Sequence, residues 1–442
     1  MYTMDEKKIL EKLHIASLTA MQQEMDGAVR RTDGDVVLLS PTGSGKTLAF
    51  MLPLVQLLDQ GRSQVQALVV VPGRELAMQL EAVFKSMGTH FRALACYGGR
   101  LTMDEHREMR AVEPHVIFGT PGRLNDHLAK GNIAPYAVRF LVIDEFDKCL
   151  EMGFQAEMSK LIKGLPGLQR RFLISATDAE QIPEYVCLGH SVRVNFLAES
   201  KLVANRVGLY EVASEVKDKL NTLSCLLRCL GQGSSIIFLN YRDSVERTTD
   251  FLRSQGFSVS AFHGGMDQKQ REAALYRFCN GSANVFVATD LASRGLDIPN
   301  VNNIIHYHLP LSEEAYIHRV GRTARWKASG QTFFVLGPEE RVPGYVNQKP
   351  VAFVFPETLP PLAKPKMSTI YIGKGRKNKL SKGDIAGFLC KKGEIPLSSI
   401  GRIDVKERYT YVAISYDSVG RVLEKVRGEK IKGIKTVVEN VN

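Results

Sequence analysis

The stretch that decides the fold is Ser40-Pro41-Thr42-Gly43-Ser44-Gly45-Lys46-Thr47, which follows the apolar run Val36–Leu39. Its two glycines let backbone N–H groups face phosphate oxygens, and the helical pattern that follows adds its N-terminal dipole. A glycine-rich turn without a ligand is the alternative, but the strand, the Lys-Thr pair and the helix occur together. We therefore predict a P-loop in which Lys46 reaches the β- and γ-phosphates and Thr47 ligates Mg²⁺. Ser40 is a departure, because the general pattern has glycine there.

A pair of acids, Asp144 and Glu145, follows the apolar run Phe140–Ile143. The carboxyl ends of parallel strands share one edge of a sheet, so these acids are expected beside the P-loop. One of them can hold Mg²⁺, partly through water, while its neighbour orients the attacking water. Two acids after a strand also occur as helix caps. It is their combination with the P-loop that favours a nucleotide site.

Short apolar runs alternate with helical patterns, and the alternation restarts after about residue 205. Continuous apolar runs are typical of parallel strands that are buried on both faces. We therefore predict an α/β chain with two tandem parallel-sheet domains and a small third domain of βαββαβ order. The expected bounds are 1–200 and 206–345 for the parallel-sheet domains, 346–366 for a Pro-rich linker, and 367–442 for the third domain. The run Val351–Phe355 is expected to dock on the second domain.

Charge is concentrated at the C-terminus. The chain carries +11, and residues 367–442 contain 16 Lys and Arg against 8 Asp and Glu. Such a module attracts a polyanion, of which nucleic acid is the expected one, although a solubilising basic surface is the alternative. The seven cysteines are scattered without a C-x-x-C pair, which favours reduced thiols in the cytoplasm over a zinc site. No apolar run is long enough to span a bilayer.

Three arginines at spacings of three, Arg319, Arg322 and Arg325, lie in the segment His318–Arg325. On a helix they share one face, and planar guanidinium groups suit a γ-phosphate because they donate two parallel hydrogen bonds. A solvated basic helix face is the alternative for this segment in isolation.

Taken in order, these motifs resemble the DEAD-box RNA helicases of helicase superfamily 2, over nearly all of residues 15–336. The elements that carry the resemblance are Gln22, Pro72–Ala77, Gly98-Gly99, Thr120–Arg123, Asp144–Asp147, Ser175-Ala176-Thr177, Phe238, Gln268 with Arg271, Thr289-Asp290, Arg294–Asp297 and His318–Arg325. The resemblance implies two RecA-like P-loop domains that bind ATP and RNA together.

The resemblance also implies a role for each matching residue. Catalysis is expected from Lys46, Thr47, Asp144, Glu145, Arg322 and Arg325, with Thr47 and Asp144 as the Mg²⁺ ligands and the two arginines as fingers on the γ-phosphate. ATP is expected to be bound by Gln22, Thr42, Gly43, Ser44, Gly45, Lys46, Thr47 and Asp297. Nucleotide state is expected to be coupled to RNA through Asp147, Ser175, Thr177 and His318. RNA is expected along Arg74, Gly99, Thr120, Arg123, Arg271, Thr289 and Arg294, mainly through its backbone.

Three residues and the region around Gln22 depart from the family pattern. Phe146 replaces a small residue, Gly73 replaces threonine, and Ala324 replaces a glycine between the two candidate fingers. The surroundings of Gln22 match poorly, which puts the selectivity for adenine in doubt.

The last segment resembles the RNA-binding domain of DbpA-type bacterial helicases, an RRM-like fold. The resemblance rests on Ile370–Gly373, Gly375–Lys377, Gly383–Ile385 and Ile400–Ile403. It implies that Lys374, Arg376 and Lys377 contact RNA and that the target is structured ribosomal RNA. Tyr409 and Tyr411 face one side of a strand, where they either stack on bases or pack under a helix.

The leading hypothesis is an ATP-dependent RNA helicase, a cytoplasmic monomer without membrane contact, that separates RNA strands locally during assembly of the large ribosomal subunit. An ATP-gated RNA clamp or annealing chaperone with little unwinding uses the same motifs and is the alternative. A DNA translocase of the same superfamily is a third reading, which the set of motifs disfavours.

Overall fold

The computed structural model describes residues 4–99, 102–178, 182–197, 207–290, 298, 301–323, 330–346 and 348–441. The described residues up to Leu197 form one compact unit, and those from Val207 onward form a second. Among the described residues, no helix is both long and apolar enough to cross a membrane.

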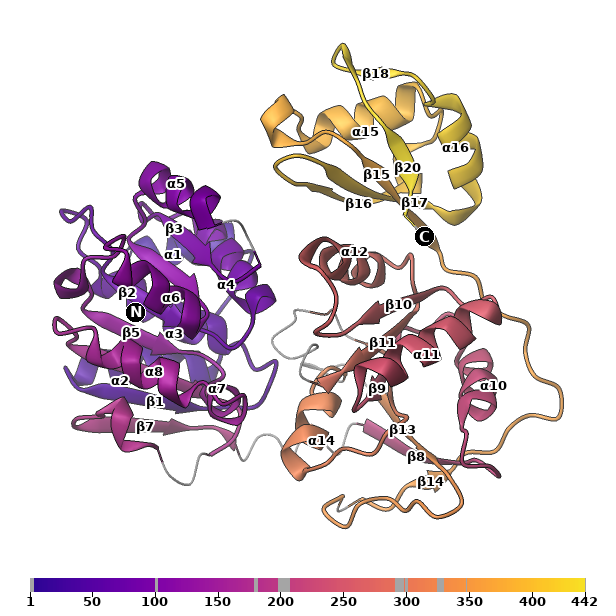
Figure 1. Cartoon of the computed structure of the whole chain (residues 1–442), viewed down its shortest axis with the longest axis horizontal. Helices are drawn as coiled ribbons and strands as arrows, with labels where there is room; N and C mark the ends of the chain where they lie inside the picture. Colours follow the sequence, from indigo (N-terminus) through magenta and orange to yellow (C-terminus); the bar gives the residue numbers. More distant parts are fainter. Residues whose placement is uncertain are drawn as a thin grey trace. The chain divides into compact units, whose positions relative to one another are not determined.

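The first unit is a parallel sheet of seven strands in the order β3-β4-β2-β5-β6-β1-β7, with helices on both faces (Figure 1). Its strands are β1 (Asp35–Leu39), β2 (Ala67–Val70), β3 (Ala93–Cys96), β4 (Val116–Gly119), β5 (Phe140–Ile143), β6 (Arg170–Ser175) and β7 (Ser191–Asn195). Its helices are α1 (Met4–Lys12), α2 (Ala20–Arg31), α3 (Lys46–Leu57), α4 (Arg74–Ser86), α5 (Thr102–Val112), α6 (Pro121–Ala129), α7 (Phe146–Glu151) and α8 (Gln155–Lys163).

Strand β1 shows why continuous apolar runs were the right signal for this sheet. Val36 and Leu38 pack into the core on one face, and Val37 and Leu39 into the core on the other. A strand covered by helices on both sides has no solvent face, so it has no polar alternation. The sequence reading missed β3 and β7, the two edge strands; three of the five β7 residues are exposed.

The second unit contains another seven-stranded parallel sheet, in the order β10-β11-β9-β12-β13-β8-β14. Its strands are β8 (Val207–Ala213), β9 (Ser235–Leu239), β10 (Val259–Phe262), β11 (Val285–Thr289), β12 (Asn303–His306), β13 (Gly330–Leu336) and β14 (Val351–Ala352). Its helices include α10 (Leu220–Leu230), α11 (Arg242–Ser254), α12 (Gln268–Cys279) and α14 (Glu313–Val320). The order repeats that of the first sheet strand for strand, so each strand of one unit has a counterpart in the other.

The segment after β13 docks as the sequence predicts. Val351 and Ala352 pair with β8, and the rings of Phe353 and Phe355 pack against the core of the second unit. This docking extends the second sheet by one short edge strand.

The C-terminal domain is a four-stranded antiparallel sheet in the order β16-β17-β15-β20. Its elements are β15 (Met367–Ile372), α15 (Lys382–Lys391), β16 (Ile400–Val405), β17 (Thr410–Ser415), α16 (Val419–Lys425), β18 (Lys430–Ile431), β19 (Ile434–Lys435) and β20 (Val438–Asn440). The predicted βαββαβ order is present. The apolar residues of the sequence predict the last strand at 432–438, and this placement is wrong. Gly433 adopts a φ of +77° and turns the chain into a small β18–β19 hairpin, so the final strand starts only at Val438.

Candidate nucleotide and RNA sites

The P-loop lies between the end of β1 and the start of α3. Gly43 and Gly45 have φ angles of +80° and +91°, a region that side chains with a Cβ avoid. Lys46 begins α3, and its Nζ donates hydrogen bonds to the backbone oxygens of Ser40 (2.6 Å) and Pro41 (2.9 Å). The loop therefore presents an ammonium group and a helix N-terminus at the same place, as expected for a phosphate site.

Gln22 contacts this loop directly. Its side-chain Nε2 donates to the backbone oxygen of Gly45 at 3.1 Å, while its Oε1 accepts from the backbone N–H of Thr19. Thr19 caps α2, so the capping box fixes the position of the glutamine. The structure thus joins Gln22 to the P-loop, although 23 residues separate it from Gly45 along the chain.

The two acids follow β5 at the same edge of the sheet. Asp144 is buried, and burial together with the neighbouring charge of Glu145 raises the pKa of its carboxyl to about 7, although the Lys46 charge opposes the shift. Glu145 has a φ of +50° and is the N-cap residue of α7, and the following Phe146 is buried in the core beneath. The large side chain of Phe146 is therefore accommodated by packing, and the acids keep their place.

These residues fit a magnesium–nucleotide complex. Two carboxylates and the hydroxyl of Thr47 are oxygen ligands of the kind that Mg²⁺ prefers. Burial and the charge of Glu145 raise the pKa of Asp144 to about 7, and a divalent cation bound between the acids would favour their ionised form.

Asp147 and the Ser175–Thr177 segment are joined by hydrogen bonds. The hydroxyl of Thr177 donates to Asp147 at 3.0 Å, and that of Ser175 donates to the Thr177 backbone oxygen at 2.6 Å. The Ser175 backbone oxygen also accepts from the N–H of Ser40 at 3.1 Å. Three of the four predicted coupling residues therefore connect the P-loop to the acid segment; the fourth, His318, is buried on α14 in the second unit.

Arg319 and Arg322 do not share one helical face, which corrects the prediction for this pair. Helix α14 ends at Val320, so the buried Arg322 lies in the turn beyond it. The Nε and Nη2 of Arg319 both donate to the carboxylate of Asp290 at 2.7 Å, and its Nη1 donates to the backbone oxygen of His308. These hydrogen bonds all lie within the second unit, so the guanidinium of Arg319 stabilises the fold of that unit. Arg325, Arg294, Asp297 and Ala324 lie outside the described residues.

The predicted RNA residues of the first unit lie at the carboxyl ends of β2, β3 and β4. A Cβ on Gly99 would stand 2.4 Å from Nη1 of Arg74, so the glycine lets this arginine lie against the backbone. Thr120 precedes α6, which contains Arg123. Glu105 of α5 binds Arg123, a contact that no sequence motif indicated.

The predicted RNA residues of the second unit are more scattered. Thr289 ends β11, and the buried Arg271 on α12 lies 4.5 Å above the ring of Phe262. In the C-terminal domain, Arg376 and Lys377 are exposed and Lys374 is half-buried. They belong to the loop after β15.

The tyrosine pair of the C-terminal domain packs on a helix. Tyr411 is buried and stacks on Tyr276 of α12, with ring centroids 5.2 Å apart, and the Tyr276 hydroxyl donates to the Arg402 backbone oxygen at 2.5 Å. The Tyr409 hydroxyl donates to Glu272 of the same helix at 2.8 Å. Of the two roles left open by the sequence, these contacts support packing.

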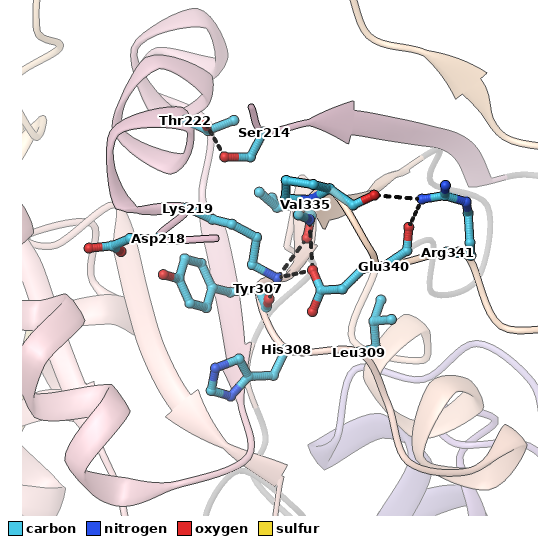
Figure 2. Close-up of polar contacts among 12 residues, drawn as sticks. Ser214, Asp218, Lys219, Thr222, Tyr307, His308, Leu309, Val335, Glu340 and Arg341 are labelled. Carbon is cyan, nitrogen blue, oxygen red and sulfur yellow. Dashed lines mark hydrogen bonds and ion pairs between the residues drawn. The ribbon is translucent and has the colours of Figure 1, made fainter. Parts of the chain in front are cut away.

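The second unit holds a lysine where the first has its P-loop. Lys219 follows β8, the counterpart of β1, and is buried. Its ammonium donates to the backbone oxygens of Tyr307 (2.5 Å) and Val335 (3.0 Å) and to the carboxylate of Glu340 (2.6 Å), as Figure 2 shows. The adjoining pocket of about 400 Å³ is lined by both acidic and basic groups. All donors of this lysine are used within the protein.

Comparison with known proteins agrees with this geometry. The DEAD/DEAH box helicase family matches residues 19–184, the helicase conserved C-terminal domain 218–327, and the DbpA RNA binding domain 369–440. The ATP-dependent RNA helicase DbpA of Escherichia coli is 34% identical over 415 residues, which cover 90% of this chain and 89% of the relative. The chain belongs to the DEAD-box ATP-dependent RNA helicases. It is therefore an RNA-stimulated ATPase.

A further relative and a solved structure are also similar to this chain. The ATP-dependent rRNA helicase RRP3 of Scheffersomyces stipitis is 36% identical over 68% of this chain and 63% of that protein. The structure of Saccharomyces cerevisiae Dbp5 bound to RNA and ADP BeF3 shares the fold, with a TM-score of 0.68 and 24% identity over 76% of this chain and 88% of that one. DEAD-box helicases use ATP, typically with Mg²⁺.

Proposed function

We propose that this DEAD-box helicase separates short strands of structured ribosomal RNA during assembly of the large ribosomal subunit. The observation that carries the proposal is the DbpA RNA binding domain match over residues 369–440. The name of the S. stipitis relative, an rRNA helicase, points the same way. We further propose that the enzyme works as a cytoplasmic monomer, with domains at 1–200, 206–345 and 367–442 and a linker at 346–366.

We assign the catalytic roles to the motif residues, and the contacts of Gln22, Lys46 and Asp144 described above support this assignment. Lys46 and the N–H groups of the P-loop bind the phosphates, with Thr42, Gly43, Ser44 and Gly45 shaping the loop. Gln22, which contacts Gly45, binds the adenine base of ATP, and Asp297 binds its ribose. Thr47 and Asp144 hold Mg²⁺, which neutralises charge on the phosphates when bound. Glu145 positions the water, and Arg322 and Arg325 stabilise charge on the γ-phosphate.

Coupling to RNA requires the two units to close on one ATP. The hydrogen bonds among Asp147, Ser175 and Thr177 supply a rigid link from the P-loop, and His318 is its proposed partner on the second unit. RNA bound along Arg74, Gly99, Thr120, Arg123, Arg271, Thr289 and Arg294 favours the same closure. Hydrolysis then releases it.

Selection of the RNA belongs to the C-terminal domain. Because Tyr409 and Tyr411 contact α12, we assign RNA binding to the basic loop with Lys374, Arg376 and Lys377. Gly375 within this loop has no room for a Cβ, which would stand 2.2 Å from the backbone oxygen of Lys406. The glycine thus holds the loop in one shape.

The test compares RNAs in an ATPase assay at fixed salt. Large-subunit ribosomal RNA should stimulate turnover at a lower concentration than an unrelated structured RNA of equal length. Reversing Lys374, Arg376 and Lys377 to Glu should remove this preference while leaving maximal stimulation intact. Reversal of Lys391 and Lys392, on another element of the same domain, is the matched control. Equal stimulation by both RNAs in the unaltered protein would contradict the proposal.

Unwinding is distinguished from annealing by a strand-separation assay on a short duplex with ATP. The unaltered enzyme should separate the strands, and Glu145→Gln should bind ATP and RNA without turnover. Strand annealing without separation would favour the ATP-gated clamp instead.

A further inference from the structure

One buried carboxylate, that of Glu105, contacts several of the segments that hold the predicted RNA residues of the first unit. Glu105 lies on α5 with its side chain fully buried. Its Oε1 accepts from the backbone N–H of Tyr97 at 3.1 Å, and its Oε2 accepts from Nε of Arg123 and lies 2.9 Å from Nε2 of His127. A buried charge is tolerated only when partners of this kind surround it.

The environment keeps this carboxylate ionised. Burial alone raises the pKa of Glu105, but the hydrogen bonds from His127 and Arg123 outweigh burial, and the net shift is downward. At neutral pH the group is therefore a fixed acceptor, and Arg123 is held by a charge-assisted bond, which is stronger than a neutral one.

The contacts connect three segments that are separate in the sequence. Tyr97 directly precedes the Gly98-Gly99 turn, and Gly99 has a φ of +92° and leaves room for Arg74. Arg123 follows the next strand in the sheet, β4. Glu105 therefore fixes the turn on which Arg74 rests and the orientation of Arg123 at the same time.

A metal centre is the competing interpretation of this cluster. Ligand atoms of Cys96, Glu105 and His127 lie within 4.8 Å of one another. The guanidinium of Arg123 already occupies Oε2 of Glu105, and a divalent cation at that oxygen would meet a positive charge at close range. The geometry favours the arginine.

We propose that Glu105 is a positioning residue for RNA binding, which acts by holding Arg123 and the Tyr97–Gly99 turn in the geometry that RNA contacts. This inference rests on the assignment of Arg74, Gly99 and Arg123 to the RNA site. Glu105 acts only through these neighbours, because its own side chain is fully buried.

The primary variant is Glu105→Gln, which keeps the size of the side chain but places an amide against Arg123. The RNA concentration for half-maximal ATPase stimulation should rise about tenfold, because a phosphate-binding arginine loses its orientation. Turnover without RNA and the KM for ATP should stay unchanged. Asp104→Asn, an equivalent change at an exposed neighbour on the same helix, is the control and should have no effect.

A double-mutant cycle separates positioning from general destabilisation. If Glu105 acts through Arg123, Glu105→Gln should add little to the loss already caused by Arg123→Ala. Fully additive losses, an unchanged RNA requirement, or a parallel rise in the KM for ATP would overturn the inference. If Glu105→Gln fails to fold, Glu105→Asp keeps the charge, and its RNA requirement should lie between those of the unaltered protein and Arg123→Ala; a normal value would overturn the inference.

Measurements on the unaltered protein distinguish a failure of this inference from a failure of the proposed function. RNA stimulation with no preference for ribosomal RNA would refute the proposed target while leaving the Glu105 test valid. Binding of added Zn²⁺ that depends on Cys96 and displaces Arg123 would favour the metal centre and would also overturn the positioning role.

Discussion

The same place in the two parallel sheets carries a lysine with opposite surroundings. Lys46 follows β1 on a loop with two positive-φ glycines, and its ammonium donates to two carbonyl oxygens of that loop. Lys219 follows β8, the matching strand, on a loop without glycine, and it binds two distant carbonyl oxygens and Glu340. One lysine can exchange its partners for a phosphate, while the other is a buried structural group.

The difference shows that the sheet fixes where a loop lies, while the residues of the loop decide which groups it can bind. Strand β12 occupies the place of β5, but Tyr307 and His308 stand where the first unit has Asp144 and Glu145. Without a pair of acids directly after β12 or a glycine cradle after β8, the second unit lacks at these two positions the arrangement that suits Mg²⁺ and phosphate in the first. A repeated fold thus yields one nucleotide site and one stabilising network.

The largest expected effect is on catalysis. Lys46→Ala should lower RNA-stimulated ATPase at least about a hundredfold, because an electrostatic contact to the phosphates is lost. Thermal unfolding should change little, since the hydrogen bonds from Lys46 to Ser40 and Pro41 are local to its loop. Normal turnover by Lys46→Ala would break the comparison, because it would move the nucleotide site elsewhere.

The second effect is on stability. Lys219→Met should destabilise the second unit by about 2–3 kcal/mol, because buried carbonyl oxygens of Tyr307 and Val335 lose a charged donor. Denaturant unfolding with a probe in the second unit measures the loss. Nucleotide titration should still give one site per chain, and Lys217→Met at an exposed position is the control. Loss of nucleotide binding without loss of stability would assign Lys219 to a second nucleotide site.

The third effect is a pH dependence of the second unit. Burial, with the neighbouring charge of Arg319, lowers the pKa of His306 well below 6.5. The pKa of His306 is thus lower in the folded than in the unfolded chain. The stability that the neutral imidazole contributes is therefore fully present above about pH 6.5 and is lost as the pH falls. The loss should approach about 1.4 kcal/mol per pH unit until the folded pKa is reached. Unfolding of His306→Gln at several pH values should show a flatter profile; an equal slope would place the acid sensitivity elsewhere.

Much of the fold and the nucleotide site was predictable because its signals are local. Continuous apolar runs marked the inner strands, and Lys46 and Asp144 stand at the strand ends where motif spacing placed them. The placement of Arg319 on a shared helical face was wrong, because a spacing of three residues does not show where a helix ends or where a guanidinium points. The contact with Asp290 decides both the direction and the burial of this side chain.

Glu105 and Lys219 carried no signal in the sequence for a related reason. A single charged residue on a helix or a loop is usually solvated. Each becomes distinctive only when folding brings partners from distant strands, such as Arg123 for Glu105 and Val335 for Lys219. Long-range polar contacts of this kind have no fixed spacing along a chain.

The smallest effect concerns the acid that neutralises Lys219. The Glu340 carboxylate also accepts from the backbone N–H of Gly337 at 2.7 Å, and a third of its side chain is exposed. Glu340→Gln keeps an acceptor and should cost about 1 kcal/mol or less, since water screens the lost charge. Burial raises the pKa of Glu340, but the bonds from Gly337 and Lys219 outweigh it and lower the pKa below its usual 4.5. The stability that this carboxylate contributes is present above that value and is lost as pH falls, so the variant and the unaltered protein should converge on acidification. A difference that persists at acid pH would mean that the shape of Glu340, rather than its charge, supports the lysine.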